Sequence, residues 1–199
     1  MAKLAQIISF LLGPIFILFP IPYILVERFS QNQIYAIKWT IFSYAFILAV
    51  AVFVIIGVLL GVFSNFDVSK REQRPLLFSF SAFAMFCYLL SLLILNGPKI
   101  LFLAFFTLLA GLIVIVIVNK WIKASIHVAT ATAVLLFIGI VYKGYYPLFL
   151  SLIPLLAWAR VKTKEHTLLE TIIGSILGAV LILIVYTVSK LFFASFIYN

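Results

Sequence analysis

Two histidines, the only ones in the chain, lie in short polar breaks between long apolar stretches. The first break carries His127 and the second carries His166. Near neutral pH, the imidazole of histidine acts as a nucleophile, a general acid or base, or a metal ligand. Ionisable side chains are costly within a membrane, so their positions in such an apolar sequence mark candidates for chemistry.

The second break places a histidine and a carboxylate four residues apart, as His166 and Glu170. If a helix begins near His166, both side chains share one face, and the carboxylate accepts the imidazole N–H. That contact fixes the tautomer and leaves the other ring nitrogen as a nucleophile or base. Arg160, at the end of the preceding apolar stretch, adds a guanidinium that suits a phosphate.

The first break alternates three functional side chains, Lys123, Ser125 and His127. An ammonium, a hydroxyl and an imidazole so close together offer one anion a charge, a hydrogen-bond donor and a proton source. Motifs this short often match by chance, and a structural histidine near a helix start is the alternative interpretation of His127.

The composition indicates an integral membrane protein, because 66% of the 199 residues are hydrophobic and only 10% are charged. Soluble domains are about half apolar and a quarter charged. We expect an all-α, polytopic transmembrane helix bundle with a single domain over residues 1–199. A single cysteine excludes an intrachain disulfide and a thiol metal site. The net charge of +9 is scattered among apolar stretches, which favours membrane lipids over nucleic acid as partners.

Seven apolar stretches can be recognised, and five of them reach the roughly 20 residues that a spanning helix needs. The other two flank a turn signal, Lys143–Pro147, and are marginal in length. We expect seven spans, with six spans or one re-entrant pair as the alternatives. The first stretch has three prolines and no cleavage site, so we expect it to be retained. The stretches are Leu4–Val26, Trp39–Phe63, Leu76–Leu95, Ile100–Val118, Ala124–Tyr142, Tyr145–Ala159 and Leu168–Val188.

Seven spans would place the connections after the second, fourth and sixth on one face of the membrane. That face receives both histidines and four of the five acidic residues. These four are Asp67, Glu72, Glu165 and Glu170. Charged residues from separate connections are therefore expected to converge at the membrane boundary, as an enzyme acting on lipid head groups requires.

The order Arg-Pro, Ser-x-His and Arg-x5-His-x3-acid resembles the type 2 phosphatidic acid phosphatase superfamily of membrane lipid phosphatases. The three motifs of that superfamily read Lys-x6-Arg-Pro, Pro-Ser-Gly-His and Ser-Arg-x5-His-x3-Asp. The resemblance spans residues 67–178, and the third motif is its most specific part. The matching residues are Arg74 and Pro75, then Ser125 and His127, then Arg160, His166 and Glu170.

This resemblance implies a metal-independent hydrolase of lipid phosphate monoesters or polyprenyl diphosphates, without a cofactor, in a prokaryotic cell membrane. By similarity, His166 attacks phosphorus to form a phosphohistidine, Glu170 orients it, and His127 protonates the leaving lipid oxygen. The residues implied to hold the phosphoryl oxygens are Arg74, Ser125 and Arg160.

The chain departs from the family motifs at several positions. Asp67 stands where the family has its lysine, which removes a cation from the phosphate site. We expect Lys123 to supply that charge, with Lys70 and Arg71 as weaker candidates. The other departures are Ala124 for Pro, Ile126 for Gly, Ala159 for Ser and Glu170 for Asp. Arg71-x-x-Arg-Pro and Lys123-x-Ser-x-His resemble variant motifs of a prokaryotic subgroup.

A small-residue motif follows the third motif and bears on helix packing. Gly174 and Gly178 form a small-residue stripe, which predicts close packing of the last helix against a neighbour.

The alternative function is a catalytically silent lipid- or anion-binding membrane protein or a small transporter. A haloperoxidase shares the superfamily's anion site but is soluble, so the hydropathy argues against it.

The side of the membrane on which the motifs lie is ambiguous from charge alone. The motif face carries nine Lys and Arg and the other face carries five. Setting aside three expected phosphate ligands leaves six against five, so the positive-inside rule decides little. The resemblance favours an extracytoplasmic or interfacial site. The nine are Lys3, Lys70, Arg71, Arg74, Lys120, Lys123, Arg160, Lys162 and Lys164, and the five are Arg28, Lys38, Lys99, Lys143 and Lys190.

Overall fold

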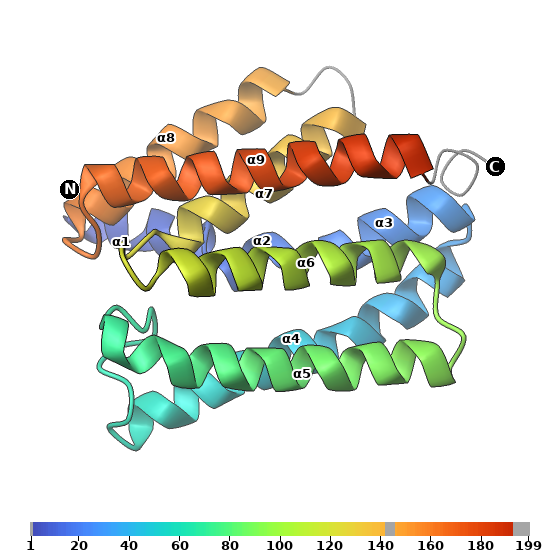
Figure 1. The fold of residues 1–199 in the computed structure, drawn as a ribbon, viewed down its shortest axis with the longest axis horizontal. Coiled ribbons are helices and arrows are strands. Elements are labelled where there is room, and N and C mark those ends of the chain that lie inside the picture. Colours follow the sequence, from blue (N-terminus) through green and yellow to red (C-terminus); the bar gives the residue numbers. More distant parts are fainter. Residues whose placement is uncertain (1, 142–145, 193–199) are drawn as a thin grey trace. The chain divides into compact units, whose positions relative to one another are not determined.

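The computed structural model describes residues 2–141 and 146–192, and throughout these residues the regular structure is helical (Figure 1). The prediction of an all-α protein is confirmed. Most of the predicted turn Lys143–Pro147 falls in residues 142–145, which lie outside the described residues. Five segments are long and apolar enough to cross a membrane: Lys3–Ser30, Gln33–Leu59, Arg71–Ile94, Lys99–Val118 and Leu168–Val188. These helices are compatible with an integral membrane protein.

The chain divides into two compact units. The central unit comprises Phe19–Val116, and the terminal unit combines Met1–Leu18 with Ile117–Asn199. The central unit contains α3 (Ile21–Ser30), α4 (Gln33–Leu59), the short 3-10 helix η1 (Arg71–Gln73), α5 (Arg74–Ile94) and most of α6 (Lys99–Val118). The terminal unit contains α1 (Ala2–Leu11), α2 (Pro14–Leu18), α7 (Ile126–Val141), α8 (Tyr146–Lys162) and α9 (Leu168–Phe192).

In the central unit, a two-residue connection folds α3 back onto α4. Gln31 adopts a left-handed conformation with φ of 49°, and its N–H donates to the carbonyl of Glu27 at 2.8 Å. Asn32 then caps α4, because its side-chain oxygen accepts the N–H of Tyr35 at 3.0 Å. These two caps satisfy backbone groups that the helix ends would otherwise leave unpaired.

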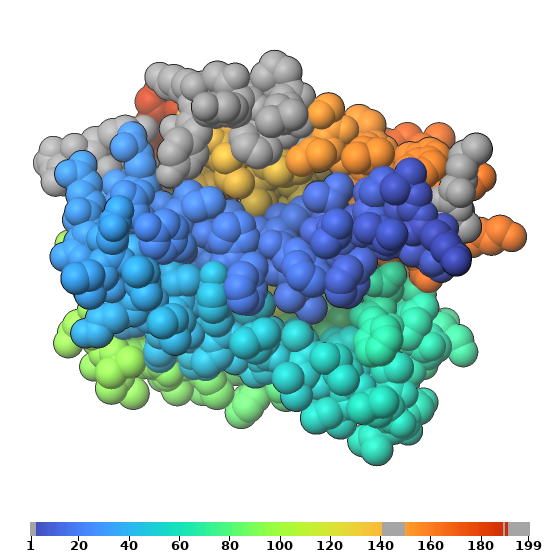
Figure 2. Space-filling model, turned by 180° about the vertical axis from the view of Figure 1, so that it is seen from behind, coloured from blue at the N-terminus to red at the C-terminus, as the bar shows by residue number. Residues whose placement is uncertain are grey.

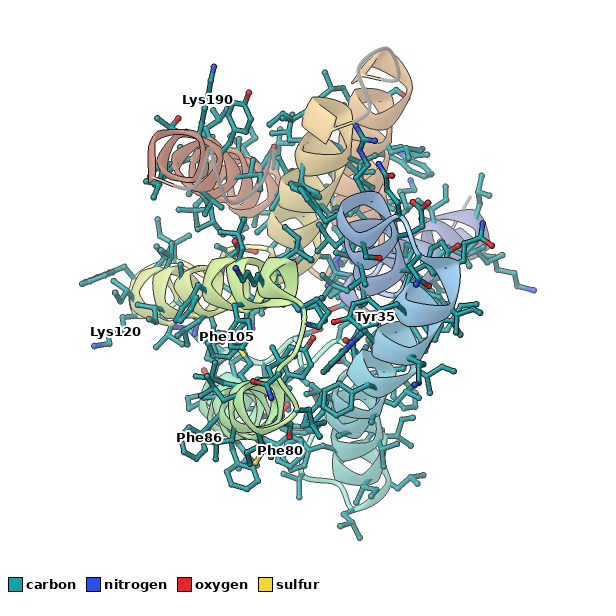
Figure 3. All side chains as sticks on the ribbon, turned by 90° about the vertical axis from the view of Figure 1, so that its right-hand side faces the viewer. Tyr35, Phe80, Phe86, Phe105, Lys120 and Lys190 are labelled. Atoms are coloured by element: carbon teal, nitrogen blue, oxygen red, sulfur yellow. The ribbon has the colours of Figure 1, made fainter. Side chains whose placement is uncertain are left out.

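Aromatic side chains join α4 to α5 within the same unit. The rings of Phe53 and Phe80 stack with their centroids 3.9 Å apart. Ser43 Oγ and Tyr88 OH lie 2.9 Å apart, so one hydrogen bond joins the two helices. Phe86, on the same helix as Phe80, is 57% exposed and points away from α5 (Figure 3). Outward-facing apolar rings of this kind suit contact with lipid rather than with water.

In the terminal unit, α9 packs closely along α7 (Figure 1). A Cβ added at Gly174 would lie 2.6 Å from the carbonyl oxygen of Ser125, and one added at Gly178 would overlap the carbonyl oxygen of Ala129. Both contacts advance in the same direction along the two helices, so α7 and α9 run parallel. The prediction that the glycine stripe packs the last helix against a neighbour is confirmed.

Helix α8 packs against α7, α9 and α1. Figure 2 shows the N-terminal helices in dark blue beside the orange of α8. A core cluster fills the space between α2, α7 and α8, with Leu156 and Val128 fully buried in it. At 16 and 17 residues, α7 and α8 are shorter than the roughly 20 residues of a spanning helix. The predicted number of six to seven spans therefore exceeds the five helices that qualify by length and composition.

Candidate active site at the connection between α8 and α9

Helix α8 ends in a Schellman motif, which fixes the chain just before His166. The N–H of Lys164 donates to the carbonyl of Val161 at 3.0 Å, and the N–H of Glu165 donates to the carbonyl of Arg160 at 3.2 Å. These are the two hydrogen bonds that define the motif. Lys164 adopts the left-handed conformation that the motif requires, with φ of 59°. Glycine usually occupies this position, so lysine here holds a strained backbone conformation.

Helix α9 begins with a capping box formed by Thr167 and Glu170. The N–H of Glu170 donates to Thr167 Oγ1 at 3.3 Å, and the N–H of Thr167 donates to Glu170 Oε2 at 3.1 Å. The Thr-x-x-Glu pattern is the usual sequence signature of this arrangement. The pattern is visible in the sequence, and it is the signal that identifies Thr167 as a residue of this connection.

The predicted contact between His166 and Glu170 is present, for a reason different from the expected one. His166 Nδ1 lies 2.8 Å from Glu170 Oε2. His166 precedes the first residue of α9, Leu168, by two positions, so the pair does not share a helical face. The capping box instead folds the carboxylate back to the helix start, where it meets both Thr167 and the imidazole. His166 is 6% exposed, so this pairing is largely shielded from water.

Two hydrogen bonds connect the break between α6 and α7 to this connection. Lys123 Nζ donates to the carbonyl of Glu165 at 2.8 Å. The N–H of Ser125 donates to the carbonyl of Glu170 at 3.1 Å. The start of α7 and the start of α9 are thereby held side by side. Two parallel helix N-termini at one place favour the binding of an anion, because their macrodipoles and backbone N–H groups add up.

Ser125 occupies the N-cap position of α7, since its carbonyl accepts the N–H of Ala129 at 2.9 Å. An N-cap serine usually offers its hydroxyl to an N–H of the first turn. Ser125 is fully buried, yet among the described residues its Oγ has no hydrogen-bond partner. A buried hydroxyl left unsatisfied is costly, so it calls for an explanation such as a bound ligand or water.

Arg160 is buried in the last turn of α8, where it is 1% exposed. Its Nη1 donates to Ser9 Oγ at 2.8 Å, and Ser9 on α1 is itself buried. Ser9 is not among the residues that the sequence predicted for the site. A lone serine in an apolar helix gives no usable signal, because such hydroxyls commonly bond to their own helix backbone.

His127 lies in the first turn of α7, close to the break between α1 and α2. A Cβ added at Gly13 would lie 3.4 Å from His127 Nε2 and 3.4 Å from the carbonyl oxygen of Ser9. The tightest contact of that Cβ would be with the carbonyl oxygen of Phe10 at 2.9 Å, so the local backbone favours glycine, and the imidazole lies within contact distance of this turn. His127 and Arg160 both approach the Ser9–Gly13 segment, so the N-terminal helix takes part in positioning two of the predicted site residues.

Arg74 belongs to the central unit, where it is the first residue of α5. Its contacts are therefore given within that unit. It is 2% exposed, and its Nε donates to the carbonyl of Val68 at 3.4 Å. Val68 has a left-handed φ of 46° and is also buried, so the loop before η1 folds over the guanidinium. The expected convergence of Arg74 with the other phosphate ligands stays a prediction.

A pocket of about 360 Å³ opens at the connection between α8 and α9. It brings together three predicted site residues, Lys123, His166 and Glu170. Its remaining lining residues are Val161, Lys164, Glu165 and Thr167. Within residues 2–141 and 146–192, no cluster of three or more His, Cys, Asp or Glu side chains could hold a metal ion. The pocket thus combines an imidazole–carboxylate pair with two lysines.

Nothing matches this chain in comparisons with protein-family models, with curated proteins and with solved structures. The resemblance to the lipid phosphatases consequently rests on the motif residues themselves.

Proposed function

We propose that this protein is a membrane-embedded, metal-independent lipid phosphatase that forms a phosphohistidine at His166. Its substrate would be a lipid phosphate monoester or a polyprenyl diphosphate. The observation that carries the proposal is the 2.8 Å contact between His166 Nδ1 and Glu170 Oε2 at a pocket lined by Lys123. A carboxylate on Nδ1 fixes the tautomer in which Nε2 carries the lone pair, which a nucleophile needs.

In the proposed reaction, His166 Nε2 attacks the terminal phosphorus while the bond from phosphorus to the leaving oxygen breaks, which is the lipid oxygen of a monoester or the bridging oxygen of a diphosphate. His127 donates a proton to that oxygen, so the lipid leaves as an alcohol, or as a lipid monophosphate when the substrate is a diphosphate. A water molecule then gives a proton to His127 and attacks phosphorus, the bond from phosphorus to Nε2 breaks, and inorganic phosphate departs. Glu170 stabilises the positive charge that develops on the imidazole, as a carboxylate does for the histidine of a catalytic triad.

The charge on the transferring phosphoryl group needs electrostatic stabilisation, which is the largest contribution in such reactions. Ser125 supports the proposal because its buried Oγ lies at the N-terminus of α7 and lacks a partner among the described residues. Arg160 and Lys123 add two positive charges from neighbouring elements. Arg74 is the further phosphate ligand that the motif resemblance implies.

The same proposal places the chain as a multi-pass protein of a prokaryotic cell membrane. Helices α7 and α8 would be two short spans in addition to the five long ones, giving seven in all, or six if only one of them crosses. The pocket would then lie where α8 ends and α9 begins, at the boundary between hydrocarbon and head groups. That depth suits a substrate with a phosphate at one end and an apolar chain at the other.

The test is phosphate release from phosphatidic acid, phosphatidylglycerol phosphate and polyprenyl diphosphates by the purified protein. We expect His166→Ala to abolish release and the acid-labile phosphoenzyme, while the variant keeps the thermal unfolding temperature of the parent. His127→Ala should slow release by about 10²- to 10⁴-fold, the usual range for a general acid. That deficit should shrink with a better leaving group.

Turnover retained by His166→Ala would contradict the phosphohistidine, as would activity that a chelator removes and a divalent ion restores. If the parent protein binds these lipids and releases no phosphate from any of them, the catalytically silent alternative holds.

A further inference from the structure

A second cavity, of about 460 Å³, adjoins the pocket described above. Val161 on α8 lines both of them. The second cavity is a groove between α8 and α9 whose floor is the buried Val128 of α7. Its walls are mainly apolar and include Ile153, Ala157, Ile172 and Ser175.

The groove leads away from the polar pocket along the helices. On α8 its lining runs from Val161 back to Ile153, and on α9 it runs from Leu168 forward to Ser175. At 1.5 Å per residue, eight residues of α8 correspond to about 12 Å. Two small side chains line the groove, Ala157 in the middle of the α8 wall and Ser175 at the far end of the α9 wall.

The hydroxyl groups that line the groove are bonded to the protein. Thr171 Oγ1 donates to the carbonyl of Leu168 at 2.7 Å. Ser175 Oγ accepts a hydrogen bond from Thr132 Oγ1 at 3.3 Å. The groove therefore presents an apolar lining directly behind a pocket that contains Lys123 and His166.

We propose that this groove binds one hydrocarbon chain of the lipid whose phosphate occupies the adjoining pocket. The inference rests on the proposed function and adds to it the place of the apolar part of the substrate. The lining has one wall on α8 and one on α9 and extends along both helices, which suits a single extended chain. The phosphate of one lipid molecule would lie in the pocket on one side of Val161, and its chain would lie in the groove on the other side.

The groove would contribute to positioning more than to affinity. In a bilayer the hydrocarbon chain is already in an apolar medium, so its transfer into the groove gains little hydrophobic free energy. Holding the chain in line with the pocket would instead keep phosphorus within reach of His166 Nε2, and misplacement by about 1 Å can cost a hundredfold in rate.

Direct binding can be tested with a non-hydrolysable alkyl phosphonate that carries a photoreactive diazirine near the end of its chain. We expect the label on residues 153–157 and 172–175 of the parent protein in lipid nanodiscs. Ala157→Leu should reduce labelling of these segments at least tenfold by filling the groove. Leu155→Trp should leave it unchanged, because it adds bulk to the same helix at an exposed residue outside the groove lining.

A photoreactive alkyl alcohol of the same chain length provides the second control. If alcohol and phosphonate label the groove equally, it holds only surrounding lipid and the inference is overturned. Labels spread evenly over the outward faces of the helices would overturn it as well.

Activity separates this inference from the proposed function. Ala157→Leu should raise KM for a long-chain lipid phosphate about tenfold or more and leave hydrolysis of a short, soluble alkyl phosphate unchanged. Equal losses on both substrates would contradict a chain-binding groove. The remaining outcome is that the parent releases no phosphate but the phosphonate still labels the groove more strongly than the alcohol does. The phosphatase proposal then fails and the binding site stands.

Discussion

The main-chain carbonyl of Arg160 accepts a hydrogen bond from the main-chain N–H of His166 at 3.3 Å. The proposed phosphate ligand and the proposed nucleophile are thus connected through their backbones, across a turn closed by the cap of α8. Their side chains are anchored separately, by Ser9 on Arg160 and by Glu170 on His166. This arrangement lets the two anchors be varied one at a time.

Glu170 serves both the imidazole and the start of α9, and two variants should separate these roles. Glu170→Gln keeps an oxygen that can accept the N–H of Thr167 but removes the charge that stabilises the imidazolium. We expect turnover to fall by about 10²- to 10⁴-fold, as for loss of a triad carboxylate, with little change in stability. Phosphate release and thermal unfolding in detergent are the two measurements.

Thr167→Ala should affect the stability of the protein more than its turnover. Loss of the N-cap hydroxyl should lower the free energy of unfolding by about 1 kcal/mol, the typical value for an N-cap, while turnover falls less than in Glu170→Gln. If Thr167→Ala stops turnover and Glu170→Gln does not, the carboxylate is only a helix cap.

Lys123 is the expected replacement for the cation that Asp67 displaces. Lys123→Ala should reduce turnover by several-fold to a thousandfold, because it removes a charge from the pocket as well as the hydrogen bond to the carbonyl of Glu165. Lys120→Ala, three residues earlier and pointing outward, is the matched control and should cost little (Figure 3). Small and equal effects of both variants would show that neither lysine carries the phosphate.

Ser9 is predicted to position Arg160 through the hydrogen bond to its Nη1. Ser9→Ala should lower kcat/KM by about tenfold to a hundredfold, since a displaced guanidinium no longer meets the phosphoryl group. Ser9→Thr retains the hydroxyl and should recover most of that loss. A purely structural role predicts another pattern, in which both variants change the unfolding temperature and leave kcat/KM as it was.

The side of the membrane can be read from the two ends of α6, each of which carries an exposed lysine. Lys120 lies at the end that leads to Lys123, and Lys99 begins the helix. We expect a membrane-impermeant thiol reagent on intact cells to modify Lys120→Cys and not Lys99→Cys, in a Cys87→Ser background. The reverse labelling would place the site in the cytoplasm.

The local features of the site could be predicted from the sequence because they depend on short-range patterns. The spacing of His166 and Glu170 predicted their contact, although the capping box with Thr167 forms it rather than a helical face. The stripe of Gly174 and Gly178 predicted close packing, and the parallel contact with α7 confirms it.

The long-range features could not be predicted from one sequence. Ser9 and Arg160 are 151 residues apart, and nothing in the apolar pattern of α1 indicates which helix it meets. The groove beside Val161 depends on small side chains from α8 and α9, which look in the sequence like ordinary membrane residues. Hydropathy also could not decide the number of spans, because α7 and α8 are short for crossing a bilayer.

The connection between α8 and α9 consists of five residues, Thr163–Thr167, and its contacts require that length. Lys164 and Glu165 close the cap of one helix, Thr167 opens the next, and His166 is the single residue between them. An inserted or deleted residue here would break one of the two caps and turn the imidazole away from Glu170. Side chains on this connection can be exchanged, but its length is fixed, so tags, reporters and loop grafts belong elsewhere in the chain.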